Sequence, residues 1–214
     1  MFTLHNIDFI RDLITKLLAY ALVITPAGAF HAWTNKKMGD STASDEGYTQ
    51  LNPLLHVDLF GLFAIMMIGL GWIKSIPFNP QNIIGKLRIP RLVIATFSGL
   101  FFYLLQALLY LISVSFFPKQ LGTSGSLLIV IGNVLMYAAG ISLGLAVLEL
   151  IFSGIKLVIH LVSEKNYYPP QHLVLTLVLA PILILFTFGT TLYALFAAGI
   201  LHIEHIISKL IGLM

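Results

Sequence analysis

Five long apolar tracts divide the chain and constrain its fold more than any other feature. Roughly 20 apolar residues cross the hydrocarbon core of a bilayer as a helix, at about 1.5 Å per residue. The tracts occupy residues 17–33, 53–72, 92–117, 127–162 and 173–200. They predict an all-α polytopic membrane protein with about five to six transmembrane helices. We expect residues 1–214 to form a single membrane-embedded domain.

The charge content excludes a water-soluble fold. Only 10% of the 214 residues are charged and 58% are hydrophobic, whereas a soluble domain of this size carries about 25% charged residues. The net charge of +3 is too small for a nucleic-acid partner. The chain has no cysteine, which excludes disulfides, thiolate metal ligands and a cysteine nucleophile. We therefore expect the lipid bilayer to be the main environment of this chain.

Two of the tracts contain residues that interrupt regular helices. Pro26 and Gly28 break the first tract. The fourth tract is about 36 residues long, too long for one straight crossing, and contains Gly132, Gly140 and Gly144. We therefore expect a broken or doubled element at residues 127–162.

The distribution of basic residues predicts an orientation in the membrane. The loop at residues 74–91 contains four Lys and Arg residues and no acidic residue, which is typical of a cytoplasmic loop. The N-terminal segment 1–16, two crossings earlier, is then expected to be cytoplasmic as well, and the loop at residues 34–51 is expected to be an outer or re-entrant loop. No small-residue cleavage site follows a short apolar core, so the first helix is not expected to be a cleaved signal peptide.

Four ionisable residues at membrane depth are candidate site residues. They are His31, His56, Asp58 and Glu149. Imidazole and carboxylate groups together suit a zinc ion, but no two of the histidines have the i, i+4 spacing of a helical zinc site. The alternative is that the first three are buried polar groups that join helix ends. For Glu149, a hydrogen bond between helices is favoured over a proton relay.

Small residues and the C-terminal tail have structural interpretations. Gly140 and Gly144 form a small-xxx-small pair, and Ala27 and Gly28 place minimal side chains in the first tract, so all four are candidate helix contacts. A simple kink next to Pro26 is the alternative for the second pair. The tail at residues 201–214 contains His202, Glu204 and His205, and its spacing indicates an amphipathic interfacial helix rather than a metal site.

Three segments in register resemble one family, the site-2 protease family of intramembrane zinc metalloproteases, in its compact bacterial form without a PDZ domain. Residues 30–43 contain FHAW and KMGDSTA, residues 51–61 read LNPLLHVDLFG, and residues 71–80 read GWIKSIPFNP. The family has HExxHAW followed by LGDxTA, then LNPLxHxDxxG, then GWxKPVPxNP. The resemblance is good over residues 20–107. It implies a site-2-protease-like core with re-entrant loops at residues 17–107 and further transmembrane helices at residues 108–200.

The resemblance fails where the family carries its chemistry. HExxH supplies two zinc-binding histidines and a glutamate general base. Residues 27–31 read AGAFH, so Ala27 replaces one ligand and Gly28 replaces the base, while His31 remains. The family's AGPxxN segment would fall on Ser98 to Tyr103, where only Gly99 survives. The third ligand, an aspartate, would fall near Leu148, with Glu149 beside it.

These departures predict a protein that does not cut. We expect a catalytically inactive site-2-protease-like protein with no cofactor. It would act as a binding, accessory or assembly subunit of a membrane protein complex, in a bacterial inner membrane or a membrane of bacterial origin. One alternative is an active zinc metalloprotease with an unusual ligand set drawn from His31, His56, Asp58 and Glu149. A second alternative is a small transporter or channel component, which would need more paired charges at midplane depth.

Overall fold

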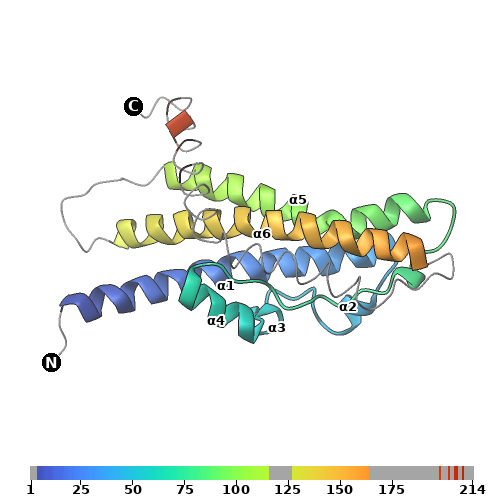
Figure 1. Ribbon diagram of the computed structural model, residues 1–214, viewed down its shortest axis with the longest axis horizontal. Coiled ribbons are helices and arrows are strands. Elements are labelled where there is room, and N and C mark those ends of the chain that lie inside the picture. Colours follow the sequence, from blue (N-terminus) through green and yellow to red (C-terminus); the bar gives the residue numbers. More distant parts are fainter. Residues whose placement is uncertain are drawn as a thin grey trace.

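Three long helices form the frame of the protein (Figure 1): α1 (Leu4–Met38), α5 (Arg88–Ser115) and α6 (Leu127–Ser163). The computed structural model describes residues 4–115 and 127–163, and five isolated positions between residues 198 and 209. All three helices are long and apolar enough to cross a membrane. Helices α1 and α6 run in the same direction, and α5 is antiparallel to both.

The segment between α1 and α5 contains only short helices, of which the three α-helices pack against α1. These are α2 (Thr42–Asp45), α3 (Pro53–His56), α4 (Leu59–Ile68) and the 3₁₀ helix η1 (Pro80–Asn82). Helix α4 has 10 residues, about 15 Å of helix, which is half of a hydrocarbon core. The second apolar tract, which we expected to be a complete crossing, is therefore not one continuous spanning helix.

Two Asn-Pro pairs begin short helices in this segment. Asn52 Oδ1 accepts a hydrogen bond from Leu54 N at 3.1 Å, and Asn79 Oδ1 accepts one from Gln81 N at 3.1 Å. The proline that follows each asparagine occupies the first helical position, where its missing N–H costs nothing. These motif residues therefore have a structural role as helix caps.

The segment returns to the end of the bundle at which α1 stops. Asp40, directly after α1, accepts hydrogen bonds from Asn79 N and from Asn82 Nδ2, both at 2.8 Å. At the opposite end, Tyr137 of α6 donates to Asp12 Oδ1 of α1 at 3.1 Å. Loop 74–91 and the N-terminus therefore lie at opposite ends of the bundle. The expectation that both are on the cytoplasmic side counted the second tract as a full crossing, and this arrangement does not support that count.

Helix α1 continues through Pro26, where we expected a break. Proline has no N–H, so the carbonyl of Leu22 loses its helical donor. Helix α5 supplies a replacement, because Tyr110 Oη donates to Leu22 O at 3.1 Å. Beside it, Gln106 Nε2 donates to Val23 O at 3.3 Å. The neighbouring helix thus satisfies the freed carbonyl, which is how membrane helices tolerate proline.

The fourth tract forms one uninterrupted helix, α6, of 37 residues. The expected break at Gly132, Gly140 or Gly144 does not occur. Gly144 faces Leu70, whose Cδ1 would lie 2.7 Å from a Cβ at that position. The fifth tract, residues 173–200, and most of the tail at residues 201–214 lie outside the described residues.

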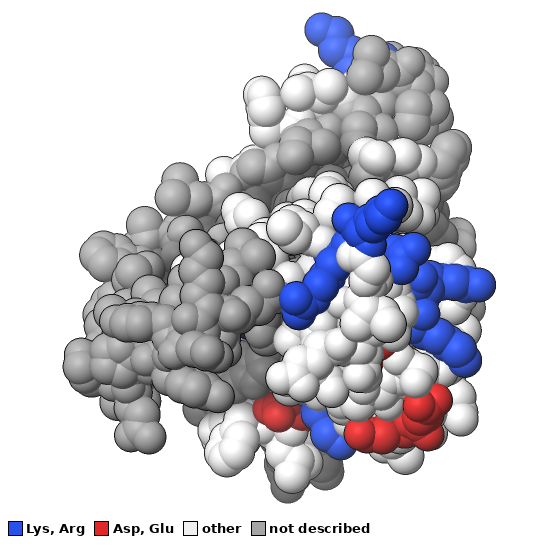
Figure 2. Space-filling view, turned by 90° about the vertical axis from the view of Figure 1, so that its right-hand side faces the viewer, with Lys and Arg blue, Asp and Glu red and all other residues white. Residues whose placement is uncertain are grey.

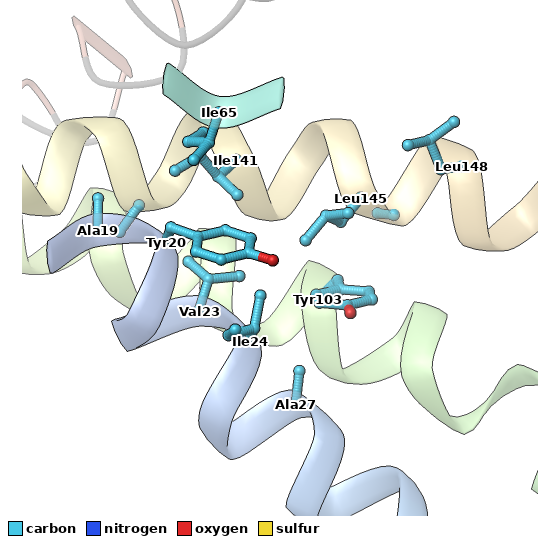
Figure 3. Close-up of a cluster of buried hydrophobic side chains, with 12 residues drawn as sticks. Ala19, Tyr20, Val23, Ile24, Ala27, Ile65, Tyr103, Ile141, Leu145 and Leu148 are labelled. Atoms are coloured by element: carbon cyan, nitrogen blue, oxygen red, sulfur yellow. The ribbon is translucent and has the colours of Figure 1, made fainter. Parts of the chain in front are cut away.

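Two buried apolar clusters hold the three long helices together. The larger cluster surrounds the middle of α1 and includes residues from α4, α5 and α6 (Figure 3). The smaller cluster lies where α1 ends and contains Ile83, Leu92 and Ala95, with Met38 and Leu157 packed against them. Met38, Leu92 and Leu157 therefore mark one depth on α1, α5 and α6.

Candidate functional site

Position 28 on α1 faces His56 at close range. A Cβ on Gly28 would overlap His56 Nδ1 and would lie 2.8 Å from both His56 Cε1 and Ile73 Cδ1. Real Cβ atoms do not approach other atoms this closely. As long as His56 keeps its position, no side chain fits at residue 28, and a glutamate fits least of all.

His56 is fully buried and held in one orientation. Its Nε2 lies 3.1 Å from the carbonyl oxygen of Gln50. Because a carbonyl only accepts hydrogen bonds, Nε2 carries the proton, and the lone pair is on Nδ1, the atom nearest to Gly28. Burial lowers the pKa of His56 below its ordinary value, although the hydrogen bond with Gln50 acts in the opposite direction. A neutral imidazole therefore fills the place of the missing general base.

Position 27 lies in the apolar core. Ala27 is 1% exposed and belongs to the same buried cluster as Tyr103, which is 2% exposed. The two side chains lie next to each other in Figure 3, with the phenol ring of α5 beside the methyl group of α1. An apolar and aromatic environment therefore surrounds the place of the missing histidine ligand.

His31 and Glu149 approach each other across α5. A Cβ on Gly99 would lie 3.1 Å from His31 Nδ1 and 3.2 Å from Glu149 Oε1. The absence of a side chain at Gly99 leaves room for both groups. Of the four candidate residues, His31 and Glu149 are thus brought together by α1, α5 and α6.

The carboxylate of Glu149 has a partner on its own helix. Ser153 Oγ lies 2.7 Å from Glu149 Oε1 and 2.9 Å from the carbonyl oxygen of Thr96 on α5. The serine thereby joins Glu149 to the neighbouring helix. Sequence reasoning did not single out Ser153, although its i, i+4 spacing from Glu149 was an available signal.

Asp58 does not join this site. Its Oδ1 accepts a hydrogen bond from Gly61 N at 2.8 Å and so caps the first turn of α4. A Cβ on Gly61 would overlap the carbonyl oxygen of Trp72, which also accepts a hydrogen bond from Tyr20 at 2.6 Å. The motif residues Asp58, Gly61 and Trp72 thus fix the short helices against α1. Sequence analysis gave no signal for Tyr20.

The described residues do not by themselves complete the zinc site of the family. Hydrolytic zinc sites use three protein ligands and keep a fourth position open. Within the described ranges, no group of three His, Cys, Asp or Glu side chains could hold a metal ion. His31 and Glu149 supply two donors, whereas His56 and Asp58 are bound elsewhere.

Comparison with known proteins identifies one related segment. A protein of Bacillus subtilis strain 168, described as "Putative zinc metalloprotease YwhC", is 41% identical over 70 residues. The match covers 30% of this chain and 32% of the relative, so it spans about a third of that protein. No family model matches the chain, and no solved structure matches it. The match supports a relationship with the site-2-protease-like proteins that the three motifs resemble.

Proposed function

We propose that this chain is a catalytically inactive site-2-protease-like membrane protein that binds other membrane proteins. The observation that supports it is that other side chains of the same chain fill the places of the missing groups. His56 occupies the space at position 28, and Tyr103 packs beside position 27. A glutamate at position 28 would meet His56, and a histidine at position 27 would have to fit into a buried apolar cluster.

The loop residues that match the family motifs also fit a role without catalysis. Asn52, Asp58 and Asn79 cap helices, and Asp40 joins the two ends of the segment between α1 and α5. All of them stabilise a scaffold. A scaffold of this kind can present a surface to a partner helix as an accessory or assembly subunit of a complex.

A second candidate function is an active metalloprotease with an unusual ligand set. The observation that favours it is the approach of His31 and Glu149 at Gly99. These two residues would hold a zinc ion together with a third protein donor from outside the described ranges. The ion would supply Lewis-acid activation of water.

Elemental analysis of the purified full-length protein separates the two functions. Under the first proposal, the wild-type chain and the His31→Ala variant contain equal, substoichiometric zinc. One zinc ion per chain that disappears in both His31→Ala and Glu149→Ala would support the metalloprotease instead. His202→Ala serves as a matched control, since it removes an imidazole from the tail.

The accessory role predicts a partner that co-purifies in mild detergent. Mass spectrometry of the purified complex identifies membrane proteins that are present in fixed proportion to the chain. A chain that purifies alone from its native membrane at native abundance would contradict the accessory role without bearing on catalysis.

We further propose a revised orientation. Segment 39–87 is re-entrant: it enters from the end at which α1 stops and returns to that end. The same end carries the basic loop 74–91, so the positive-inside rule places it in the cytoplasm. The N-terminus then lies on the opposite side of what we propose to be a bacterial inner membrane.

A further inference from the structure

The two ends of the helix bundle differ strongly in charge. At the end where α1 stops, Lys and Arg residues gather over the surface, and acidic residues occupy only one margin of it (Figure 2). The opposite end has two ion pairs, Arg11–Asp8 at 3.0 Å and Lys16–Asp12 at 2.7 Å. Charge is therefore balanced at the N-terminal end of the described helices and uncompensated at the other end.

Three of the basic residues lie at one depth on three different helices. Met38, Leu92 and Leu157 pack together in one apolar cluster with Ile83 and Ala95. The residue immediately before each of the three is basic. These residues are Lys37 on α1, Arg91 on α5 and Lys156 on α6. All three are exposed, and together they form what we call the basic girdle.

The girdle is at the depth where a lipid headgroup would lie. Between Lys16 and Lys36, α1 carries no Lys, Arg, Asp or Glu, and 20 residues of helix span about 30 Å, the thickness of a hydrocarbon core. Trp33 is 48% exposed, and Lys37 Nζ lies 5.6 Å from the centre of its ring. Tryptophan at this position is typical of a membrane interface, with lysine just beyond it.

No acidic side chain neutralises the girdle within the described residues. None of its three side chains has a carboxylate within ion-pair distance there, since both ion pairs of the described chain lie at the other end. Asp40, the acid nearest to the end of α1 in sequence, accepts its hydrogen bonds from Thr42, Asn79 and Asn82. The girdle therefore has unused positive charge at the headgroup level.

We propose that the basic girdle of Lys37, Arg91 and Lys156 binds the phosphate groups of anionic phospholipids. Guanidinium and ammonium groups donate charge-assisted hydrogen bonds to phosphate oxygens. Each basic residue near an anionic leaflet adds to the electrostatic attraction between protein and lipid. Because the three residues belong to three helices, lipid binding depends on how those helices pack. Lipid binding by the girdle does not depend on whether the protein is an active protease.

The test measures lipid binding by the full-length protein with native mass spectrometry in detergent. We expect phosphatidylglycerol to bind more tightly than phosphatidylcholine, with a preference that weakens as salt is added. The triple variant Lys37→Gln/Arg91→Gln/Lys156→Gln should bind phosphatidylglycerol roughly 100-fold more weakly, about fivefold per residue. Its affinity for phosphatidylcholine should not change, which also shows that the variant is folded.

There are two matched controls. One conserves the charge of the girdle, and the other removes two basic residues at the opposite end of the bundle. Lys37→Arg/Arg91→Lys/Lys156→Arg should keep the preference, and so should Arg11→Gln/Lys16→Gln. Equal affinity of the wild type for the two lipids, or a salt-independent preference, would overturn the proposal without any variant and would favour an acidic protein partner. Displacement of phosphatidylglycerol by inorganic phosphate at equal concentration would also overturn it, because the site would then be one for the free ion.

Discussion

Gly28 and His56 act as one steric unit, because the imidazole of His56 occupies the space next to the α-carbon of Gly28. The imidazole is fully buried and fixed by Gln50, so it cannot move aside without losing a hydrogen bond. The glycine is required because of the close approach of the ring rather than because of an unusual backbone angle. A substitution at either residue should therefore be felt at the other.

Replacing Gly28 by Ala should destabilise the protein by about 1–3 kcal/mol, the usual range for overpacking a filled interior. The added Cβ overlaps His56 Nδ1. Thermal unfolding in detergent measures the change. In a His56→Ala background, where the imidazole is absent, Gly28→Ala should cost less stability than it does in the wild type. Gly154→Ala is the control, because a Cβ at that helical position meets nothing within 4 Å. Equal melting temperatures for Gly28→Ala and Gly154→Ala would refute the contact.

His56 should also make the stability depend on pH. Its pKa in the folded protein is below its ordinary value because the ring is buried, and the ordinary value in an unfolded chain is about 6.5. Between these two values the unfolded chain binds a proton that the folded chain does not. The stabilisation is therefore complete above about pH 6.5 and is lost as the pH falls below it, by at most about 1.4 kcal/mol per pH unit.

The measurement compares melting temperatures of the wild type and His56→Gln between about pH 7.5 and pH 5. The glutamine amide can still donate to the Gln50 carbonyl but does not titrate. We expect a smaller decrease on acidification for the variant. Parallel pH profiles would show that His56 does not contribute to the pH dependence.

At this scale the sequence identified the residues but not their pairing. Gly28 was recognised as a contact or kink position, and His56 and Glu149 as buried polar candidates. The sequence could not show that His56 fills position 28, because the two are brought together by a segment whose path depends on distant hydrogen bonds. The approach of His31 to Glu149 was likewise open, since it depends on Gly99 of a third helix.

At the scale of elements, Asp40 fastens the segment between α1 and α5 at both ends. The carboxyl accepts hydrogen bonds from Thr42, Asn79 and Asn82. Burial alone would raise its pKa, but these hydrogen bonds outweigh burial and hold the pKa of Asp40 below its ordinary value. The charged form is therefore the one that joins the two loops.

Replacing Asp40 by Ala should cost about 1–3 kcal/mol, because the donors of Asn79 and Asn82 lose a buried, charged acceptor. Limited proteolysis should then cut loop 74–91 faster than in the wild type. Asp45→Ala is the matched control: its carboxylate accepts a hydrogen bond from Ser41 at 2.7 Å in an exposed position. If both variants are digested at the wild-type rate, Asp40 does not restrain this loop.

The repair of α1 at Pro26 leads to a second prediction about elements. Tyr110→Phe removes the donor to Leu22 O, and we expect a loss of about 1 kcal/mol, the scale of a hydrogen bond between membrane helices. In a Pro26→Ala background the alanine N–H can bond to Leu22 O within the helix, so the same substitution should cost less. A double-mutant cycle from thermal unfolding measures the difference, and a coupling of zero would contradict the repair.

Apolar tracts predicted the three long helices well and the second tract poorly. Residues 53–72 have the hydropathy of a crossing, but Pro53, the cap at Asp58 and the left-handed Gly69, with φ of 75°, divide them into short helices. Hydropathy alone does not register these local stops. The reverse error occurred at α6, where glycines suggested a break but the helix is continuous, and Gly144 instead leaves room for Leu70.

At the scale of the whole molecule, the distribution of basic residues fits a topology in which the second tract is not a crossing. The basic end contains the loop 74–91, the end of α1 and Lys156, whereas the N-terminal end is neutralised by its own ion pairs. One net crossing by each of α1, α5 and α6 is consistent with this distribution. The His31–Glu149 pair lies in the half of the bundle that we propose to be in the cytoplasmic leaflet.

This arrangement predicts that Gln81 and Asp8 lie on opposite sides of the membrane. The chain contains no cysteine, so Gln81→Cys and Asp8→Cys each introduce a single reactive thiol. In intact cells, a membrane-impermeant maleimide should label Asp8→Cys and leave Gln81→Cys unmodified until the membrane is permeabilised. The physical reason is that segment 39–87 returns to the end at which α1 stops, so only one crossing separates the two sites. Labelling of both thiols from the same side of sealed membranes would mean that the second tract crosses completely, and it would overturn the re-entrant path together with the orientation.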